Sequence, residues 1–330
     1  MTHRRRFGDS YRATVEFCRP IRHIGAENLC FSTNEATMAG ATIPFRKMNG
    51  LGNEFVVFDG RSGPVRLSPE AIQALGAADS IGFDQMITIE RARGGADAFM
   101  RIHNRDGGEV DACGNATRCV GWLLMGESRK GDAVIETNAG LLRAYDTGTP
   151  EMITVDMGRP RFRWDEIPLA EEFRDTRAIE LQIGPIDDPI LHSPSAVSMG
   201  NPHAIFWVDD VAAYDLGRFG PMLENHPMFP ERANISLAHV VSPTAMTVRT
   251  WERGAGLTRA CGTAACAAAV AAMRKELVER KVTVTLPGGP LVIEWRDDGH
   301  VWMTGPVETE FEGTIDADTL AWQPTAKGAA

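Results

Sequence analysis

The chain has 330 residues, of which 43% are hydrophobic and 24% charged, a composition typical of globular proteins. Its formal net charge is −10 and no basic stripe runs along it, which argues against nucleic acid or an anionic membrane as the main partner. No apolar run reaches the roughly 18 residues that a transmembrane helix needs.

The cysteine content indicates a reducing compartment. Six cysteines in so long a chain do not make a disulfide scaffold, and the N-terminus lacks the apolar region of a secretory signal. We therefore expect a cytoplasmic protein with free thiols.

Residues 1–42 differ from the rest of the chain. They hold six arginines and no lysine, and they show no clear periodicity. A disordered tail, a targeting peptide and an upstream start in place of Met38 all fit them, although several acidic residues weaken the targeting interpretation. We favour an extension that has no function, disordered or non-native.

From residue 43 the sequence predicts a mixed α/β structure. Segments dense in β-branched and aromatic residues end in Gly or Asp turns, as strands do. In chain order we expect strands within 54–60, 85–93, 98–107, 133–145, 152–158, 203–210, 245–256, 281–295 and 300–308. Helices are fewer, and we expect them within 68–76, 115–126 and 262–278, the last being rich in alanine.

An internal repeat organises these elements. The segment NRDGGEVDACGNA (104–116) aligns without a gap on ERGAGLTRACGTA (252–264), an offset of 148 residues. The same offset places LGNEFVVF (51–58) on MGNPHAIF (199–206). We therefore predict two pseudo-symmetric domains, 43–158 and 159–306, with residues 307–322 returning to the first. Each would be a mostly antiparallel sheet curled around one central helix.

The repeat singles out Cys113 and Cys261. Each stands just before a predicted helix, where free backbone N–H groups and the helix dipole favour a thiolate. Each is followed by a glycine, which lets a ligand approach those amides. Cys119 and Cys266 have no cysteine at the matching position of the other copy, so we expect them to be packing residues.

Three kinds of site compete for the duplicated cysteines. A structural zinc site is disfavoured, because the spacings lack the short Cys-x2-Cys pattern. A single nucleophilic cysteine with a histidine base would leave the twin cysteine unexplained. Inversion of a stereocentre needs one group that removes a proton from one face and another that delivers one to the opposite face, and two matched thiols meet that need. We expect no metal.

Several motifs resemble those of the diaminopimelate epimerase family. They are KMNGLGNEF, GFDQ, HNRDGGEVDACGNATRC, MGNPH, ERANI and WERGAGLTRACGTAACA, and they cover residues from about 44 to 310 in the family's order. The resemblance implies interconversion of LL- and meso-2,6-diaminopimelate, a step of lysine and peptidoglycan precursor synthesis, without a cofactor. It also implies an active site in a cleft between the two domains and leaves a homodimer open.

The resemblance assigns site residues one position at a time. Cys113 and Cys261 resemble the two acid–base thiols, and Gly114, Asn115, Gly262 and Thr263 the amide cradle of the substrate carboxylate at the reacting centre. The remaining positions that resemble binding residues are Asn53, Asn104, Asn201 and Asn234 for the distal amino-acid end, Arg253 for its carboxylate, Glu252 for an ammonium group, and Gln85 and His203 lining the site. His203 and Glu252 are also expected to tune the thiols.

Two observations concern the identity of the substrate pocket. Ala116, Thr117, Ala264 and Leu257 depart from the residues usual in the family, which puts details of the pocket in doubt rather than the chemistry. A proline or hydroxyproline racemase shares the two-thiol logic on a similar fold. A cyclic imino acid has no second amino-acid end, so the distal residues favour diaminopimelate.

Overall fold

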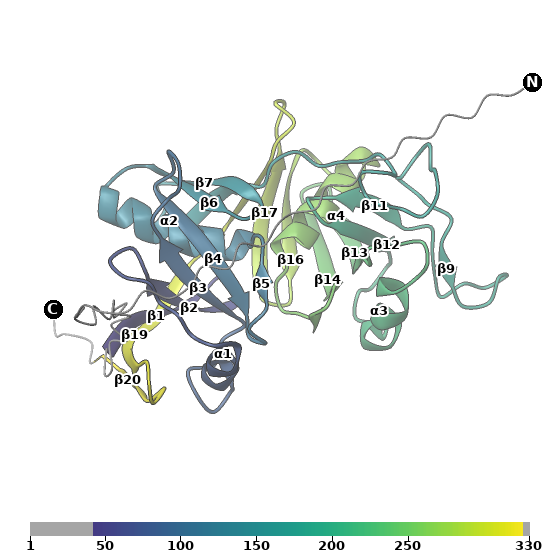
Figure 1. Ribbon diagram of the computed structural model, residues 1–330. Coiled ribbons are helices and arrows are strands. Elements are labelled where there is room, and N and C mark those ends of the chain that lie inside the picture. Colours follow the sequence, from purple (N-terminus) through teal and green to yellow (C-terminus); the bar gives the residue numbers. More distant parts are fainter. Residues whose placement is uncertain (1–41, 326–330) are drawn as a thin grey trace, which may run out of the picture. The chain divides into compact units, whose positions relative to one another are not determined.

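The computed structural model describes residues 42–325 (Figure 1). Four helices occur in this part of the chain: α1 (Pro69–Gly76), α2 (Gly114–Ser128), α3 (Leu216–Glu224) and α4 (Gly262–Arg274). The predicted extension lies outside the described residues, except that Thr42, its expected last residue, already pairs with Asp316 in a strand.

The strands fall into two sets. The first half of the described chain contains β1 (Thr42–Asn49), β2 (Glu54–Asp59), β3 (Gln85–Glu90), β4 (Ala98–Asn104), β5 (Glu109–Val110), β6 (Asp132–Thr137), β7 (Gly140–Asp146) and β8 (Met152–Asp156). The second half contains β11 (Ser195–Ser198), β12 (Pro202–Trp207), β13 (Asn234–Ser242), β14 (Ala245–Glu252), β15 (Gly256–Leu257), β16 (Lys281–Leu286), β17 (Gly289–Trp295) and β18 (Val301–Pro306). Four more are β9 (Gln182–Ile183), β10 (Leu191–His192), β19 (Glu308–Asp316) and β20 (Trp322–Pro324).

The two halves have the same strand connections. In the first half, hydrogen-bonded neighbours run β1–β2–β3–β4–β6–β7–β8. In the second, they run β11–β12–β13–β14–β16–β17–β18. The parallel pairs β2–β3 and β4–β6 recur as β12–β13 and β14–β16, and the other pairs in these two runs are antiparallel. The repeat seen in the sequence is therefore a repeat of topology.

One continuous sheet joins the halves. β8 pairs antiparallel with β18, and β19 crosses back to pair with β1. The backbone register repeats as well: the pair Phe55–Gln85 of β2 and β3 matches the pair His203–Asn234 of β12 and β13. The mixed, curled sheet with one long buried helix in each half agrees with the fold class expected from the sequence.

The helices α2 and α4 lie against different parts of this sheet (Figure 1). α2 contacts β6, β7 and β8, whereas α4 contacts β11–β14 and β16–β18. Both helices are buried along most of their length, which explains why α4 consists so largely of alanine. Gly121 permits a close approach in α2, since a Cβ there would lie 2.3 Å from the Cβ of Ala144 on β7.

Two helix predictions were inaccurate. α4 ends at Arg274 rather than at residue 278, and Glu276 just beyond it has a φ of 58°, a left-handed conformation that does not continue a helix. α3 was not expected, because Pro221 and two glycines lower its helix propensity. Tertiary packing stabilises it: a Cβ at Gly220 would lie 2.4 Å from the Trp251 ring, so only glycine fits there.

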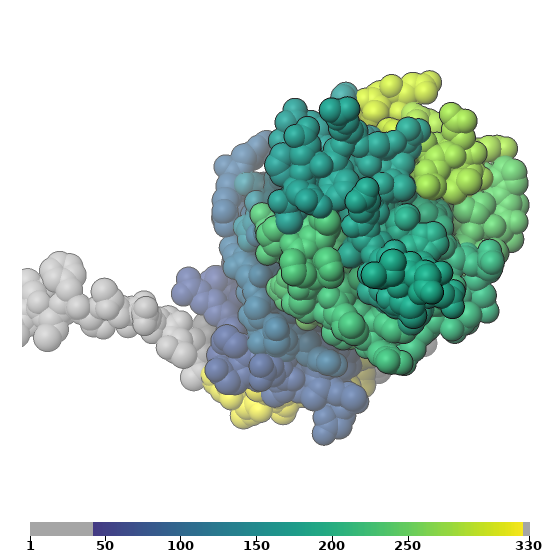
Figure 2. Space-filling view, turned by 90° about the vertical axis from the view of Figure 1, so that its right-hand side faces the viewer, coloured from purple at the N-terminus to yellow at the C-terminus, as the bar shows by residue number. Residues whose placement is uncertain are grey.

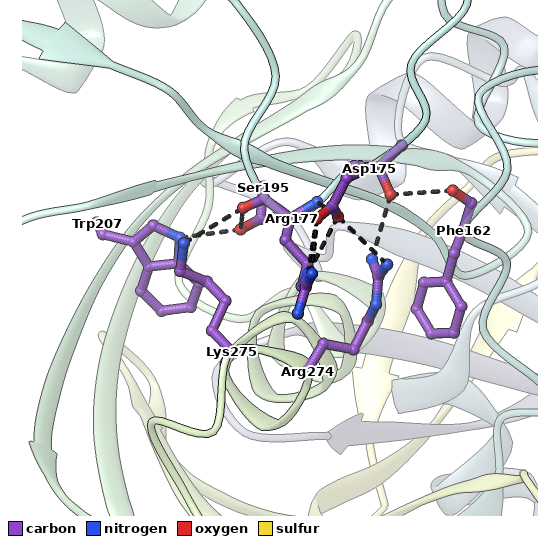
Figure 3. A network of polar contacts seen from close by, with 8 residues as sticks. Phe162, Asp175, Arg177, Ser195, Trp207, Arg274 and Lys275 are labelled. Atoms are coloured by element: carbon purple, nitrogen blue, oxygen red, sulfur yellow. Dashed lines mark hydrogen bonds and ion pairs between the residues drawn. The ribbon is translucent and has the colours of Figure 1, made fainter.

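The segment 159–194 connects β8 to β11, and nothing within residues 42–113 of the first half corresponds to it. It carries the small hairpin β9–β10, and its residues form part of the surface seen from the side of the second half (Figure 2). Figure 3 shows that the side chains at the end of α4 point toward it. Arg274 donates to Thr176 Oγ1 at 3.1 Å and stacks on the Phe162 ring at 4.1 Å, and Lys275 donates to the carbonyl of Arg177.

A second part of this network fixes the segment to the sheet. Ser195 Oγ of β11 donates to the Arg177 carbonyl at 2.7 Å and accepts from Trp207 Nε1 of β12 at 3.0 Å (Figure 3). The inserted segment therefore holds the C-terminal end of α4 in place. No helix between residues 42 and 325 is long and apolar enough to cross a membrane.

Candidate active site

Cys113 and Cys261 occupy the same place in the two halves. Each is the N-cap residue of its helix, α2 or α4, in an extended conformation with φ of −147° and −118°. Neither side chain caps its own helix, so the first backbone N–H groups of both helices remain available to another acceptor.

The glycines after the two cysteines lie against one methionine. A Cβ at Gly114 would lie 3.0 Å from Met303 Cε, and a Cβ at Gly262 would lie 2.9 Å from Met303 Sδ. Met303 on β18 therefore contacts the starts of both helices, and a side chain at either glycine would displace it.

A hydrogen bond from Asn115 links the two helix N-termini. Asn115 Nδ2 donates to the carbonyl of Ala260, the residue before Cys261, at 3.3 Å. The same nitrogen lies 3.4 Å from Asn53 Oδ1, which also accepts from Cys113 Sγ at 3.8 Å. One amide side chain thus contacts groups beside both thiols.

The first half supplies amide groups around Cys113. Asn53 Nδ2 donates to Asp84 Oδ2 at 3.1 Å, which orients its oxygen toward the thiol. Gln85 Nε2 donates to Asn104 Oδ1 at 2.9 Å between β3 and β4. Gln85 Oε1 is buried and has no hydrogen-bond partner among residues 42–325, so it could accept from a bound ligand.

The second half uses a different set of side chains around Cys261. Thr263 Oγ1 lies 3.5 Å from Cys261 Sγ and 3.4 Å from Asn201 Nδ2. Asn201 Oδ1 accepts from His203 Nε2 at 2.9 Å, which makes the Nε2–H tautomer the one that fits. Burial, and secondarily the charge of Arg253, lowers the pKa of His203 to about 3, so this imidazole is neutral at physiological pH.

Two further predicted residues lie close together in the second half. Asn234 Nδ2 donates to the carbonyl of Pro202, and its Oδ1 accepts from the backbone N–H of Arg253 at 3.0 Å. The guanidinium of Arg253 donates to the carbonyl of Glu231 at 2.9 Å and has no carboxylate partner within the described chain. It is therefore available to an anionic ligand.

Glu252 is a carboxyl group whose charge acts on both thiols. It accepts a short hydrogen bond from Thr258 Oγ1 and is hydrogen-bonded with Cys261. Burial raises the pKa of the Glu252 carboxyl, and its negative charge raises the pKa of both Cys113 and Cys261. The starts of the two helices are brought together by the contacts of Asn115 and Met303 described above.

The sequence model of the family described as diaminopimelate epimerase matches residues 45–163 and 195–310. The chain belongs to this family. The unmatched residues between the two stretches fall within the inserted segment 159–194.

Curated relatives agree over most of the chain. A diaminopimelate epimerase of Brucella anthropi is 58% identical over 297 residues, which cover 87% of this chain and 98% of that protein. A diaminopimelate epimerase of Rhodopseudomonas palustris is 60% identical over 279 residues, covering 84% of this chain and 94% of that one.

Solved structures support the fold alone, because their sequences are distant. A Bacillus anthracis phenazine biosynthesis protein of the PhzF family has a TM-score of 0.58 at 17% identity, covering 83% of this chain and 99% of that chain. A hydroxyproline epimerase from Agrobacterium vitis has a TM-score of 0.59 at 14% identity, covering 84% and 93%.

Against this family background, the thiols differ from the sequence-based expectation in one respect. We expected the helix N-termini to lower their pKa. Instead, burial raises the pKa of Cys113 to about 11 and that of Cys261 well above its ordinary value. Backbone N–H groups at the helix starts act in the expected direction, but desolvation is the larger effect.

The other cysteines match their expected burial. The side chains of Cys119 and Cys266 are 0% exposed in the cores of the two halves. Among the described residues, no three His, Cys, Asp or Glu side chains gather closely enough to ligate a metal ion.

Sequence reasoning missed two residues of this site. Met303 had no distinguishing sequence pattern. Arg118 is the residue of the first copy that aligns with Cys266, and we considered it only as a position without a cysteine. A charged residue on the apolar helix α2 was itself a signal. Its guanidinium is fully buried and donates to Asn115 Oδ1 at 2.9 Å.

Proposed function

We propose that this protein interconverts LL-2,6-diaminopimelate and meso-2,6-diaminopimelate, with Cys113 and Cys261 as the two acid–base groups. The observation that carries the proposal is the placement of one thiol at each of two helix N-termini related by the internal repeat, in a chain that belongs to the diaminopimelate epimerase family. Opposed, equivalent groups are what inversion at carbon requires.

In each turnover one cysteine is a thiolate and the other a thiol. The thiolate takes the α-proton: the C–H bond breaks, an S–H bond forms, and the electron pair moves into the substrate carboxylate. The second thiol then gives its proton to the opposite face of the same carbon and becomes the thiolate. The reverse reaction exchanges the two roles, so the groups must be chemically alike.

The helix starts suit the charge that develops during this reaction. The N–H groups after Cys113 and Cys261, on Gly114, Asn115, Gly262 and Thr263, are candidates to hold the substrate carboxylate at the reacting centre. Negative charge grows on this carboxylate as the proton leaves, and two helix dipoles and free amides stabilise it.

Glu252 gives the substrate a way to activate the thiols. Its carboxylate raises the pKa of both cysteines. An ammonium group of the substrate that pairs with Glu252 would neutralise this charge and make a thiolate easier to form. Activation would then occur only when substrate is bound.

The distal residues fit the second amino-acid end of diaminopimelate. Arg253 has no carboxylate partner among residues 42–325, and the amides of Asn53, Asn104, Asn201 and Asn234 offer donors and acceptors for a second ammonium and carboxylate. We place the reaction in lysine and peptidoglycan precursor synthesis in the cytoplasm. No cofactor enters the proposed steps, and a homodimer remains a prediction.

The test is a parallel assay of LL-diaminopimelate, L-proline and trans-4-hydroxy-L-proline in ²H₂O without added pyridoxal phosphate or metal. We expect inversion and α-deuteration of diaminopimelate alone. Inversion of an imino acid with inert diaminopimelate, or exchange that requires pyridoxal phosphate, would contradict the proposal.

A further inference from the structure

Arg118 is a buried cation without an anionic partner. Its side chain is fully inaccessible to solvent, one of the largest such side chains in the described chain. Its Nε donates to the carbonyl of Pro306 at 3.3 Å, and its Nη1 contacts Asn115 Oδ1 and Met303 Sδ. No carboxylate lies within ion-pair distance in residues 42–325, and Nη2 has no hydrogen-bond partner there. Buried arginines are normally paired, so this one requires an explanation.

The ionisable groups around Arg118 are thiols. The charges that act on its guanidinium come from Cys119, Cys113 and Cys266, on α2, at the start of α2 and on α4. Burial raises the pKa of Cys113, helix-start amides and the Arg118 guanidinium lower it, and Glu252 raises it. Burial, Glu252, Thr263 and the Ala264 amide act on Cys261, and Arg118 is not among its causes. The positive charge of Arg118 thus acts on Cys113, whereas the negative charge of Glu252 acts on both thiols.

Arg118 also determines which way the Asn115 side chain faces. A guanidinium only donates hydrogen bonds, so Asn115 must turn Oδ1 toward it at 2.9 Å. This orientation leaves Nδ2 free to donate to the carbonyl of Ala260 and to approach Asn53 Oδ1. With the amide reversed, each of those oxygens would face another oxygen. The link between the two helix N-termini therefore depends on Arg118.

The repeat shows that the fold does not need an arginine here. The matching residue of α4 is Cys266, which is as fully buried as Arg118. On the strand β18, a Cβ at Gly305 would lie 2.4 Å from Leu291 Cδ2 and 3.2 Å from the Arg118 guanidinium carbon, so the glycine leaves room for both side chains. One half accommodates a buried cation that the other half replaces with a small side chain.

We propose that Arg118 is a positioning residue of this site: it orients the Asn115 amide that links the two helix N-termini, and it places a positive charge on the Cys113 side of the site, where Asn115 and Asn53 connect it to the thiol. The inference rests on the two-thiol function proposed above. The Glu252 carboxylate opposes both thiolates, whereas the Arg118 cation favours the Cys113 thiolate, so loss of the cation should affect Cys113 more than Cys261.

The test measures thiol ionisation without substrate, so that it stays separate from the identity of the substrate. Iodoacetamide alkylation of Cys113 and Cys261 is followed by mass spectrometry against pH in the full-length protein and in Arg118→Met, Arg118→Lys and Cys266→Ala, together with the melting temperature. We expect Arg118→Met to slow alkylation of Cys113 at pH 8 by at least about threefold, with a smaller change at Cys261.

The remaining variants separate charge from geometry. Arg118→Lys keeps the charge but loses the planar fork, so alkylation of Cys113 stays within about twofold while kcat for diaminopimelate falls at least about tenfold. Cys266→Ala, which alters the same buried region, leaves both alkylation profiles unchanged. An unchanged Cys113 profile in folded Arg118→Met would overturn the proposal.

A further variant serves if Arg118→Met does not fold. Arg118→Gln removes the charge but keeps an amide donor in the same buried region, so we expect slower Cys113 alkylation in this variant as well. Equal or faster alkylation of Cys113 in this variant would also overturn the proposal. Failure of wild type to act on diaminopimelate would count against the proposed function and not against this result.

Discussion

The two halves of the molecule have the same backbone but different charged residues. Strand order, the two parallel pairs and the helix that begins directly after a cysteine all recur. At matching positions, however, Arg118 corresponds to Cys266, Asn104 to Glu252, and Phe55 to His203. The first half holds the buried cation near the thiols, and the second half holds the partly buried carboxylate of Glu252 and the buried imidazole of His203.

This difference separates two requirements of an epimerase. Opposed thiols demand symmetry, which a duplicated backbone supplies. The substrate is not symmetric about its reacting carbon, because the four groups on that carbon are hydrogen, a carboxylate, an amine and a long chain. Divergence of the residues around the thiols supplies that asymmetry, and each of the following experiments alters one side of the comparison.

Removal of either thiol should have the largest effect. We expect Cys113→Ser and Cys261→Ser each to lower kcat for epimerisation by about 10³-fold or more, because each removes one acid–base group. In ²H₂O, each variant should exchange the α-hydrogen only of the stereoisomer whose hydrogen faces the remaining cysteine. Cys119→Ala and Cys266→Ala are the matched controls and should retain activity. Near-normal turnover in either serine variant would refute the two-thiol mechanism.

The next two variants remove the carboxylate at position 252 and add one at the matching position 104. Glu252→Gln should lower kcat/KM for LL-diaminopimelate by about 10²-fold, since a charged hydrogen bond to the substrate ammonium is lost. In the substrate-free protein, the same change should speed alkylation of both cysteines at a fixed pH, because the carboxylate raises their pKa.

Position 104 offers the matched change with the opposite sign. Asn104→Asp adds a carboxylate at the place in β4 that corresponds to Glu252 in β14 and should slow alkylation of Cys113. For the earlier variant, Glu252→Gln, the contradicting outcome is slower alkylation of the cysteines, which would show that the Glu252 carboxylate supports the thiolates rather than opposing them.

The sequence predicted the two helix N-termini at Cys113 and Cys261 because the repeat marked them. Two cysteines at one offset, each followed by glycine and a helix, were enough to find both helix N-termini. Every strand that was predicted exists, since those segments combine β-branched residues with clear turns. β13 (Asn234–Ser242) was missed although it carries Asn234, and α3 was missed because its stability comes from contact with Trp251 and not from its own residues.

Electrostatics could not be predicted in the same way. The pKa of a thiol at a helix start depends on how much solvent reaches it, and the residues next to Cys113 and Cys261 in the sequence do not predict how deeply the two thiols are buried. Likewise, the contact from Arg118 to Asn115 was predictable from helical spacing, but the lack of a carboxylate beside Arg118 was not. These features depend on the whole fold.

The pair His203 and Phe55, which occupy matching positions in the two halves, predicts a smaller effect, on how the free energy of unfolding depends on pH. Because the folded-state pKa of His203 is about 3 and its unfolded value is near 6.5, the unfolded chain binds a proton more readily between these values. Stability should therefore fall as pH drops below about 6.5, by about 2 kcal/mol at pH 5 from this group. His203→Phe, which installs the first-half residue, should show a correspondingly weaker loss between pH 7.5 and 5.

Urea unfolding at both pH values measures the His203 effect. His192→Ala removes an exposed histidine and serves as the control, with a pH dependence equal to that of wild type. An undiminished loss of stability in His203→Phe would mean that other groups account for the acid sensitivity.

The smallest expected effect concerns the far ends of the paired helices. α4 ends in Arg274, which bonds to Thr176 and stacks on Phe162, whereas α2 ends beside the exposed Arg129. Arg274→Ala should lower the free energy of unfolding by about 1 kcal/mol, through loss of a cation–π contact and a hydrogen bond. Arg129→Ala should change it by less than about 0.5 kcal/mol. Cys261 lies at the opposite end of α4, so kcat should be unchanged in both variants. A fall in kcat confined to Arg274→Ala would instead show that the inserted segment sets the position of the second thiol through the length of the helix.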